Sequence, residues 1–112
     1  MTEVNYPEMI EKLPEINISI PGVVGRLMQA GNKQLVFFDI DPTGVVPPHS
    51  HGAQWGIVVD GEIELTIGGE AKIYTKGDSY YIPAGVVHSG RVIKQLKAID
   101  IFDEPARYQP KP

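Results

Sequence analysis

Residues 44–61 read GVVPPHSHGAQWGIVVDG, and this stretch decides the fold. His49 and His51 stand two residues apart, so in an extended strand both side chains leave the same face. After them, runs at 55–59 and 62–67 read as strands on either side of Asp60-Gly61. An Asp-Gly pair between two strands is the strongest short-range hairpin signal, so the stretch predicts two antiparallel strands joined by a tight turn.

The rest of the chain has the same texture of short strands and turns. Glycine and proline supply 12 and 10 of the 112 residues, which is typical of many short strands joined by tight turns. The fold class is therefore expected to be all-β, a small barrel or jelly roll, with an immunoglobulin-like sandwich as the alternative. Further strands are expected at 16–20, 23–30, 34–40, 71–75, 79–82, 86–88 and 94–102.

The length predicts a single domain with short additions at both ends. Residues 1–15 are expected to form a solvated N-terminal arm, with one or two helical turns at 6–12 between Pro7 and Pro14. The barrel is expected to span residues 16–103, and the proline-rich residues 104–112 form a C-terminal tail.

Composition excludes several classes of function. The chain has no cysteine, which rules out a disulfide framework, a thiolate metal site and cysteine catalysis. The net charge is −4 and the basic residues are scattered, so nucleic acid is not an expected partner. No apolar run reaches the length of a membrane span, and residues 1–5 lack the pattern of a secretory signal. We therefore expect a cytoplasmic protein with no membrane partner.

The three histidines, with one glutamine, fall into a metal-binding pattern. A turn at Gly52-Ala53 would let Gln54 begin the next strand facing the same way as the histidines. His88 follows the turn Pro83-Ala84-Gly85, which could return it to the same end of a barrel. Three imidazoles and an amide oxygen suit a divalent ion of Fe, Ni, Mn, Co, Cu or Zn. The alternative is that the histidines are structural residues with satisfied hydrogen bonds.

Asp100 is a candidate for proton transfer. In the strand at 94–102 it shares a face with Leu96, Ala98 and Phe102. A carboxylate on an apolar inward face is costly in free energy unless it is paired or lies beside a metal. Burial would raise its pKa toward a value useful in acid–base catalysis. If that face points to solvent instead, Asp100 is an ordinary surface acid.

Arg26 is a second candidate on a different strand. It shares a face with Val24 and Met28, and an arginine that points into a barrel would suit a carboxylated substrate. A salt bridge at the rim or in a dimer is an equal alternative.

The aromatic residues are expected to pack in the core or an interface, although Tyr81 or Trp55 could line the mouth of a pocket; these residues are Phe37, Phe38, Trp55, Tyr80 and Tyr81.

Taken together, two motifs resemble those of the cupin superfamily. The first comprises Gly44, His49-Ser50-His51, Gln54 and Gly61, and the second comprises Gly77, Pro83-Ala84-Gly85 and His88. The chain departs from the family pattern in three ways: a shorter gap after His51, Gln54 in place of glutamate, and Val92 in place of asparagine. The resemblance implies a jelly-roll barrel with one divalent metal on His49, His51, Gln54 and His88.

A narrower resemblance is to small KdgF-type cupins, carried by residues 54–61, 77–85 and 99–102. It implies conversion of 4,5-unsaturated uronates to linear keto sugars, with Asp100 and Arg107 as functional groups. Because glutamine is neutral, it leaves the metal its full charge, which favours Lewis-acid chemistry over redox chemistry.

These observations lead to a metal-dependent enzyme that acts on a small sugar-acid-like molecule, with lyase, isomerase or hydrolase-type chemistry. Asp100 would move the proton, and Arg26 or Arg107 would hold the substrate carboxylate. The alternatives are a non-catalytic ligand-binding or structural module and an oxygen-using cupin dioxygenase. A homodimer is implied by the resemblance, and the predicted strand at 16–20 would need a partner edge.

Overall fold

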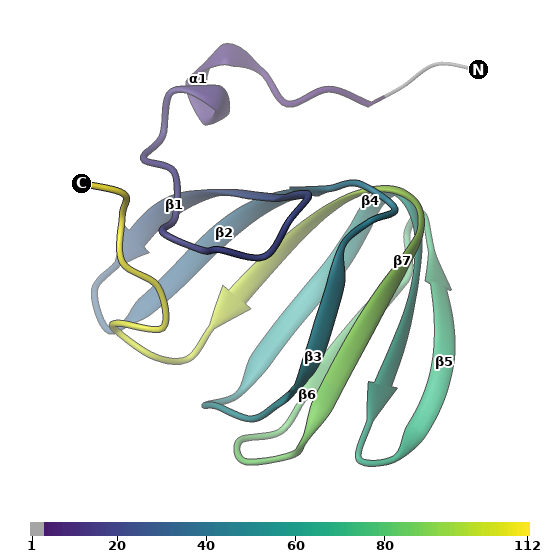
Figure 1. Cartoon of the computed structure of the whole chain (residues 1–112). Helices are drawn as coiled ribbons and strands as arrows, with labels where there is room; N and C mark the ends of the chain where they lie inside the picture. The colour runs from purple at the N-terminus through teal and green to yellow at the C-terminus, as the bar shows by residue number, and fades with distance from the viewer. Residues whose placement is uncertain (1–3) are drawn as a thin grey trace.

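The computed structural model describes residues 4–112 and consists mainly of antiparallel strands (Figure 1). The all-β jelly-roll class predicted from the sequence is confirmed. One short helix, α1 (Glu8–Glu11), begins after Pro7 and ends before Pro14. The strands are β1 (Val23–Ala30), β2 (Lys33–Ile40), β3 (Val45–His49), β4 (Gln54–Ile67), β5 (Glu70–Thr75), β6 (Ser79–Ile82) and β7 (His88–Phe102).

The predicted hairpin at Asp60-Gly61 is wrong. β4 runs straight through both residues and pairs with β7 along its length, with register shifts on either side of Asp60. Gly61 has a φ of +91°, and a Cβ there would run into the carbonyl oxygen of Gln95 on β7. A glycine with positive φ serves a bulge as well as a turn, which is why the dipeptide misled the prediction. The separate strand expected at 86–88 is not formed: only its last residue, His88, is in a strand, and it begins β7, which contains the strand expected at 94–102.

The two long strands belong to two walls of the barrel. The first half of β4 and the second half of β7 pair with each other and lie between β6 and β2, with β1 beyond β2. The other halves lie between β5 and β3. The irregular register near Gly61 marks the change from one wall to the other, and side chains from both walls line one internal cavity.

The inner face of β7 follows the alternation expected from its sequence. Leu96, Ala98, Asp100 and Phe102 are each about 1% exposed. The surface-acid alternative for Asp100 is therefore excluded. Apolar residues of β2, β4 and β6 complete the core around them.

The strand expected at 16–20 is not formed. The segment makes only isolated bridges, because it lies between β1 and the C-terminal tail. Ile16 donates its backbone N–H to Gly25 at 2.9 Å, and Asn17 donates to Gln109 at 2.7 Å. Ile18 and Ile20 then pack against the core.

No helix among residues 4–112 is long and apolar enough to cross a membrane.

Candidate metal centre

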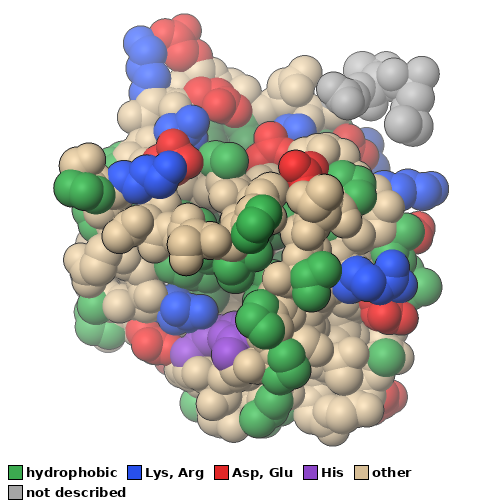
Figure 2. Space-filling view, viewed as in Figure 1, with side chains coloured by type: hydrophobic (Ala, Val, Ile, Leu, Met, Phe, Trp, Pro, Cys, Tyr) green, Lys and Arg blue, Asp and Glu red, His purple; other side chains and the backbone are tan. Residues whose placement is uncertain are grey.

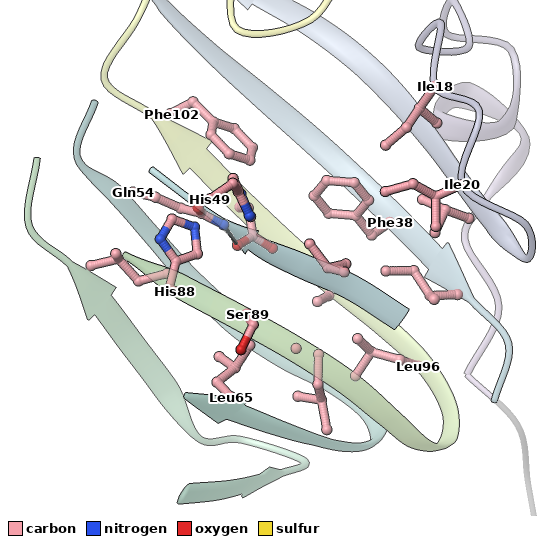
Figure 3. Close-up of a pocket in the computed structure, with 18 of the residues that line it drawn as sticks. Ile18, Ile20, Phe38, His49, Gln54, Leu65, His88, Ser89, Leu96 and Phe102 are labelled. Atoms are coloured by element: carbon pink, nitrogen blue, oxygen red, sulfur yellow. Dashed lines mark hydrogen bonds between the residues drawn. The ribbon is translucent and has the colours of Figure 1, made fainter. Parts of the chain in front are cut away.

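The three histidines meet where β3 ends and β7 begins. His49 closes β3 and is the cross-strand partner of His88, the first residue of β7. His51 lies in the loop after β3, and Gln54 opens β4, as the predicted turn at Gly52-Ala53 requires. Figure 3 shows His49, His88 and Gln54 at one end of the cavity. The ligand atoms of the three histidines all lie within 4.8 Å of one another.

Backbone carbonyls set the orientation of each imidazole. The Nδ1 atoms of His49, His51 and His88 lie 2.9, 2.8 and 2.9 Å from the carbonyl oxygens of Pro47, Gly52 and Val86. A carbonyl only accepts, so each Nδ1 carries the proton and each Nε2 keeps its lone pair. Histidines that bind metals are held in this way.

Two of the three Nε2 atoms are not satisfied by any other contact among residues 4–112. Those of His51 and His88 are buried and have no hydrogen-bond partner within the described part of the chain. Burial lowers the pKa of both imidazoles, so they are neutral at neutral pH, which is the form that binds a metal. Buried, neutral and convergent nitrogen atoms fit a divalent transition ion and leave little reason for a purely structural arrangement.

Gln54 lies beside the histidines and contacts a buried carboxylate. Its Nε2 donates a 2.6 Å hydrogen bond to Oδ2 of Asp100, so the amide oxygen is left without that contact and is available as a ligand. Tyr80 donates from its hydroxyl to the same carboxylate, at 3.0 Å from Oδ1 and 2.9 Å from Oδ2.

Gly56 makes the Tyr80–Asp100 contact possible. Tyr80 on β6 and Asp100 on β7 are both cross-strand partners of Gly56, one on each side of it. A Cβ at position 56 would overlap both the carboxylate and the phenol ring. The missing side chain lets the two residues meet above β4.

The environment of Asp100 suits proton transfer. Complete burial raises its pKa to about 7, although the hydrogen bonds from Gln54 and Tyr80 act in the opposite direction. Burial and the adjacent Asp100 raise the pKa of Tyr80 well above its ordinary value, so the phenol stays protonated. A carboxyl group with a pKa near 7 can both give and take a proton at neutral pH.

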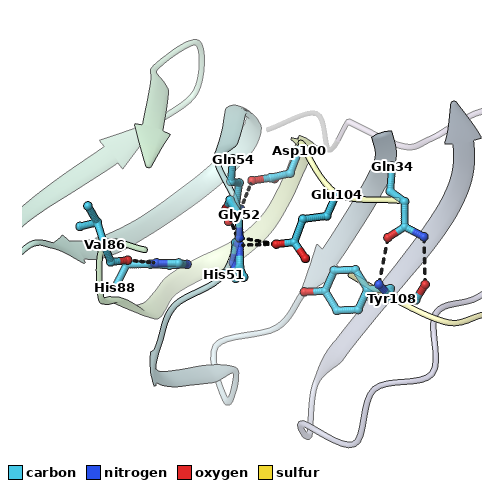
Figure 4. A network of polar contacts seen from close by, with 9 residues as sticks. All are labelled: Gln34, His51, Gly52, Gln54, Val86, His88, Asp100, Glu104 and Tyr108. Carbon is cyan, nitrogen blue, oxygen red and sulfur yellow. Dashed lines mark hydrogen bonds and ion pairs between the residues drawn. The ribbon is translucent and has the colours of Figure 1, made fainter. Parts of the chain in front are cut away.

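The two candidate arginines lie in different places. Arg107 lines the cavity, and its guanidinium carbon lies 4.5 Å from the centre of the Tyr108 ring. Gln34 holds this part of the tail through two 2.9 Å hydrogen bonds to the backbone of Tyr108 (Figure 4). Arg26 is not among the cavity residues; it approaches Glu15 at 4.0 Å from the N-terminal segment.

Two contacts at the site were not predicted from the sequence. Tyr80 was expected only to pack, yet its alternation with the buried Ile82 already places its hydroxyl on the inner face. Glu104 binds the backbone N–H of Gly52 and lies 3.6 Å from Nδ1 of His51 (Figure 4). No local pattern marks Glu104, because it comes from the tail. Trp55 and Tyr81 do not line the cavity.

The cavity beside the histidines has a volume of about 160 Å³. Figure 2 shows histidine side chains exposed on this side of the molecule, next to hydrophobic side chains and a basic residue. Most polar lining residues gather near the histidines, and the other walls are mainly apolar apart from Ser89 and Tyr108; the residues of the polar end are His49, Gln54, Tyr80, His88, Asp100 and Arg107.

Comparison with known proteins agrees with this geometry. The sequence model of the cupin domain family matches residues 36–102. The chain is 29% identical over 119 aligned positions to the H2HPP isomerase of Bacillus subtilis, covering 96% of this chain and 50% of that relative. The chain therefore spans about half the length of this curated relative.

Two solved structures share the fold. KdgF from Halomonas sp. superposes with a TM-score of 0.73 at 26% identity, covering 82% of this chain and 86% of that protein. An RmlC-like cupin from Shewanella frigidimarina NCIMB 400 superposes with a TM-score of 0.78, also at 26% identity, covering 96% of both chains.

Proposed function

The chain belongs to the cupin domain family, and on that premise we propose that it is a metal-dependent isomerase or lyase acting on a small oxygen-bearing substrate. The observation that carries the proposal is the hydrogen bond from Gln54, which lies beside His49 and His88 in one cavity, to the buried carboxyl group of Asp100. The enzymes KdgF and H2HPP isomerase among its relatives support a catalytic role.

Four side chains would hold the metal: His49, His51, Gln54 and His88. A divalent ion bound there supplies Lewis-acid polarisation of a carbonyl or hydroxyl oxygen. The neutral ligand set leaves the charge of such an ion undiminished. The hydrogen bonds of the three Nδ1 atoms fix the rings before any ion binds, so little reorganisation is required.

Asp100 would take a proton from one atom of the substrate and return it to another. Tyr80 and Gln54 hold both carboxylate oxygens in place, and the buried setting keeps competing water away. Arg107 would bind a substrate carboxylate, because it lines the same cavity and its Nε is buried without a hydrogen-bond partner in residues 4–112. Arg26 does not line the cavity and would hold the N-terminal segment instead, through Glu15.

A 4,5-unsaturated uronate is the substrate that the KdgF-type resemblance implies, and it stays a prediction. The likeness to KdgF from Halomonas sp. supports it, and so does the pairing of Asp100 with Arg107 at one cavity. Loss of the ultraviolet absorbance of the unsaturated ring gives a direct assay. Retained activity without dioxygen would separate this chemistry from that of a dioxygenase.

The proposal is tested first by elemental analysis of tag-free protein prepared without chelators, with wild type beside His88→Ala. We expect about one transition metal per chain in the wild type and loss of it in the variant. Absence of metal in both samples, even after soaking with Ni, Mn, Fe and Zn salts, would contradict the proposal. Turnover that survives in metal-free protein would contradict the mechanism while leaving the site intact.

We also propose a homodimer that forms through the outer face of the first wall. A row of apolar side chains crosses this face on paired strands, with exposures of 60% for Tyr81, 39% for Trp55, 36% for Ile101 and 45% for Met28. Leu35 completes the row between Ile101 and Met28. A continuous exposed apolar row of this kind is typical of an interface between proteins.

The expected edge pairing of 16–20 is not the basis of this dimer, because that segment is bridged to β1 and to the tail of its own chain. In a symmetric dimer, a twofold axis would pack the row of one copy against the same row of the other. Sedimentation of the protein should give twice the monomer mass, and a monomer at micromolar concentration would contradict the proposal.

A further inference from the structure

The cavity has two ends of different chemistry. The polar end holds the histidines, Gln54 and Asp100, whereas Ile18, Ile20 and Phe38 lie away from them (Figure 3). Ile18 and Ile20 come from the segment that failed to form a strand, and they close the cavity against the core. The remaining apolar lining residues are Val23, Ile40, Val46, Pro47, Ile63, Leu65, Ile82, Leu96, Ala98 and Phe102.

This wall offers few partners to a ligand rich in hydroxyl groups. Away from the polar end, the hydroxyls of Ser89 and Tyr108 are the polar side-chain groups among the described residues that line the cavity. A sugar acid presents several hydroxyl groups around its ring, and each one buried without a hydrogen bond weakens binding. The apolar walls instead favour a ligand that buries carbon.

The size of the cavity limits that ligand. Its volume is about 160 Å³. An apolar cavity of roughly 150 Å³ in another protein is known to hold one benzene molecule. The cavity therefore has room for a body of about one six-membered ring.

We propose that the site selects a compound with an apolar body of about six carbon atoms and one oxygen-bearing head group, such as a carboxylate or a keto acid. The head group lies at the histidine end within reach of Arg107, and the body lies against Phe38, Ile18 and Ile20. The assignment of the head group rests on the proposed function, whereas the assignment of the body rests on the cavity wall alone and stands in place of the uronate ring that the KdgF-type resemblance predicts.

The test compares two carboxylates with a six-membered ring. Cyclohexanecarboxylate has an apolar ring, and glucuronate has a ring bearing hydroxyl groups. Isothermal titration calorimetry with metal-loaded protein is expected to give at least tenfold tighter binding for cyclohexanecarboxylate. Equal affinities, tighter binding of glucuronate, or no binding of either compound would overturn the proposal.

Variants of the covering segment locate the ring. The double variant Ile18→Ala/Ile20→Ala removes apolar surface from the wall, and we expect cyclohexanecarboxylate to bind about tenfold more weakly or worse, since each methylene lost in an apolar pocket costs that much or more. Binding of acetate, which has the head group and no ring, should be unchanged. Val24→Ala, which trims an outward residue of β1, is the matched control and should leave both affinities unaltered.

A second variant places a larger side chain inside the cavity. Ala98 is about 1% exposed and lines the cavity, so Ala98→Leu should abolish binding of cyclohexanecarboxylate while the metal content stays the same. If this variant unfolds, which circular dichroism would reveal, the Ile18→Ala/Ile20→Ala comparison still decides. Undiminished binding in both variants would overturn the proposal.

Metal analysis of every sample separates the two proposals. Protein that holds metal but prefers glucuronate refutes the apolar ligand and leaves the proposed function standing. Protein that holds no metal refutes the proposed function, and the same pair of carboxylates then tests the cavity wall with Arg107 as the sole anchor.

Discussion

Neighbouring residues on three paired strands face opposite sides of the same wall and have opposite environments. The inward set is Gly56, Tyr80 and Asp100, and the outward set is Trp55, Tyr81 and Ile101. Hydrogen bonds hold the inward carboxylate, and it is about 1% exposed. The outward side chains keep over a third of their surface in solvent.

The contrast teaches that, on the proposed function and the proposed dimer, a step of one residue along a strand separates the catalytic face from the interface. The alternation of a strand places one set beside the histidines and the other on the apolar outer row. Matched substitutions at adjacent positions should therefore change different properties of the protein. Three such pairs put that separation to the test.

The largest difference is expected between Asp100→Asn and Ile101→Asn. Asp100→Asn removes the group that is proposed to move the proton, so turnover should fall by about a hundredfold or more, the usual contribution of acid–base catalysis, with metal content retained. Ile101→Asn should keep turnover and weaken the dimer. Steady-state kinetics, metal analysis and sedimentation of both variants give the answer. Equal turnover in the two would remove Asp100 from the mechanism.

The second pair is Gly56→Ala and Trp55→Ala. A methyl group at position 56 overlaps Tyr80 and Asp100, so the free energy of unfolding should fall by about 1–3 kcal/mol, as in other overpacked cores, and turnover should fall with it. Trp55→Ala removes an outward side chain and should leave turnover unchanged while loosening the dimer. Urea unfolding measures the first effect. A Gly56→Ala protein as stable and active as the wild type would show that the close approach above β4 is unimportant.

The smallest difference is expected between Tyr80→Phe and Tyr81→Phe. The first loses the hydrogen bonds to Asp100, which should lower the free energy of unfolding by about 1 kcal/mol and reduce turnover about tenfold. The second removes a hydroxyl from an exposed ring and should change neither. Thermal unfolding and steady-state kinetics of the two variants, measured side by side, test this prediction. A loss in Tyr81→Phe that matches the loss in Tyr80→Phe would break the separation of the faces.

The parts of the site that sequence reasoning could anticipate are those fixed by local geometry. Strand alternation put Asp100 on one face with Leu96, Ala98 and Phe102 and left open whether that face points inward, and the spacing of His49 and His51 placed those two side chains together. The turn at Gly52-Ala53 brought Gln54 back to the same end of the barrel. Each of these inferences needed only a few neighbouring residues.

What sequence reasoning could not supply depends on contacts between distant segments. Asp60-Gly61 suits a hairpin and a bulge equally well, and the pairing of β4 with β7 selects the bulge. The alternation at 16–20 resembles a strand, but Gln109 of the tail accepts a hydrogen bond from the backbone N–H of Asn17. The direction of Arg26 and the approach of Glu104 follow from tertiary packing in the same way.

The pairing of β7 sets the order in which the molecule can be completed. β7 is the shared neighbour of β2, β3 and β4, so before it is synthesised the chain can form the β1–β2 and β4–β5 hairpins but no sheet that connects them. His88 and Asp100 lie on that last strand. A nascent chain on the ribosome therefore cannot bring His49, His88 and Asp100 together until β7 has emerged, so the proposed metal site would be complete only once that strand has joined the sheets.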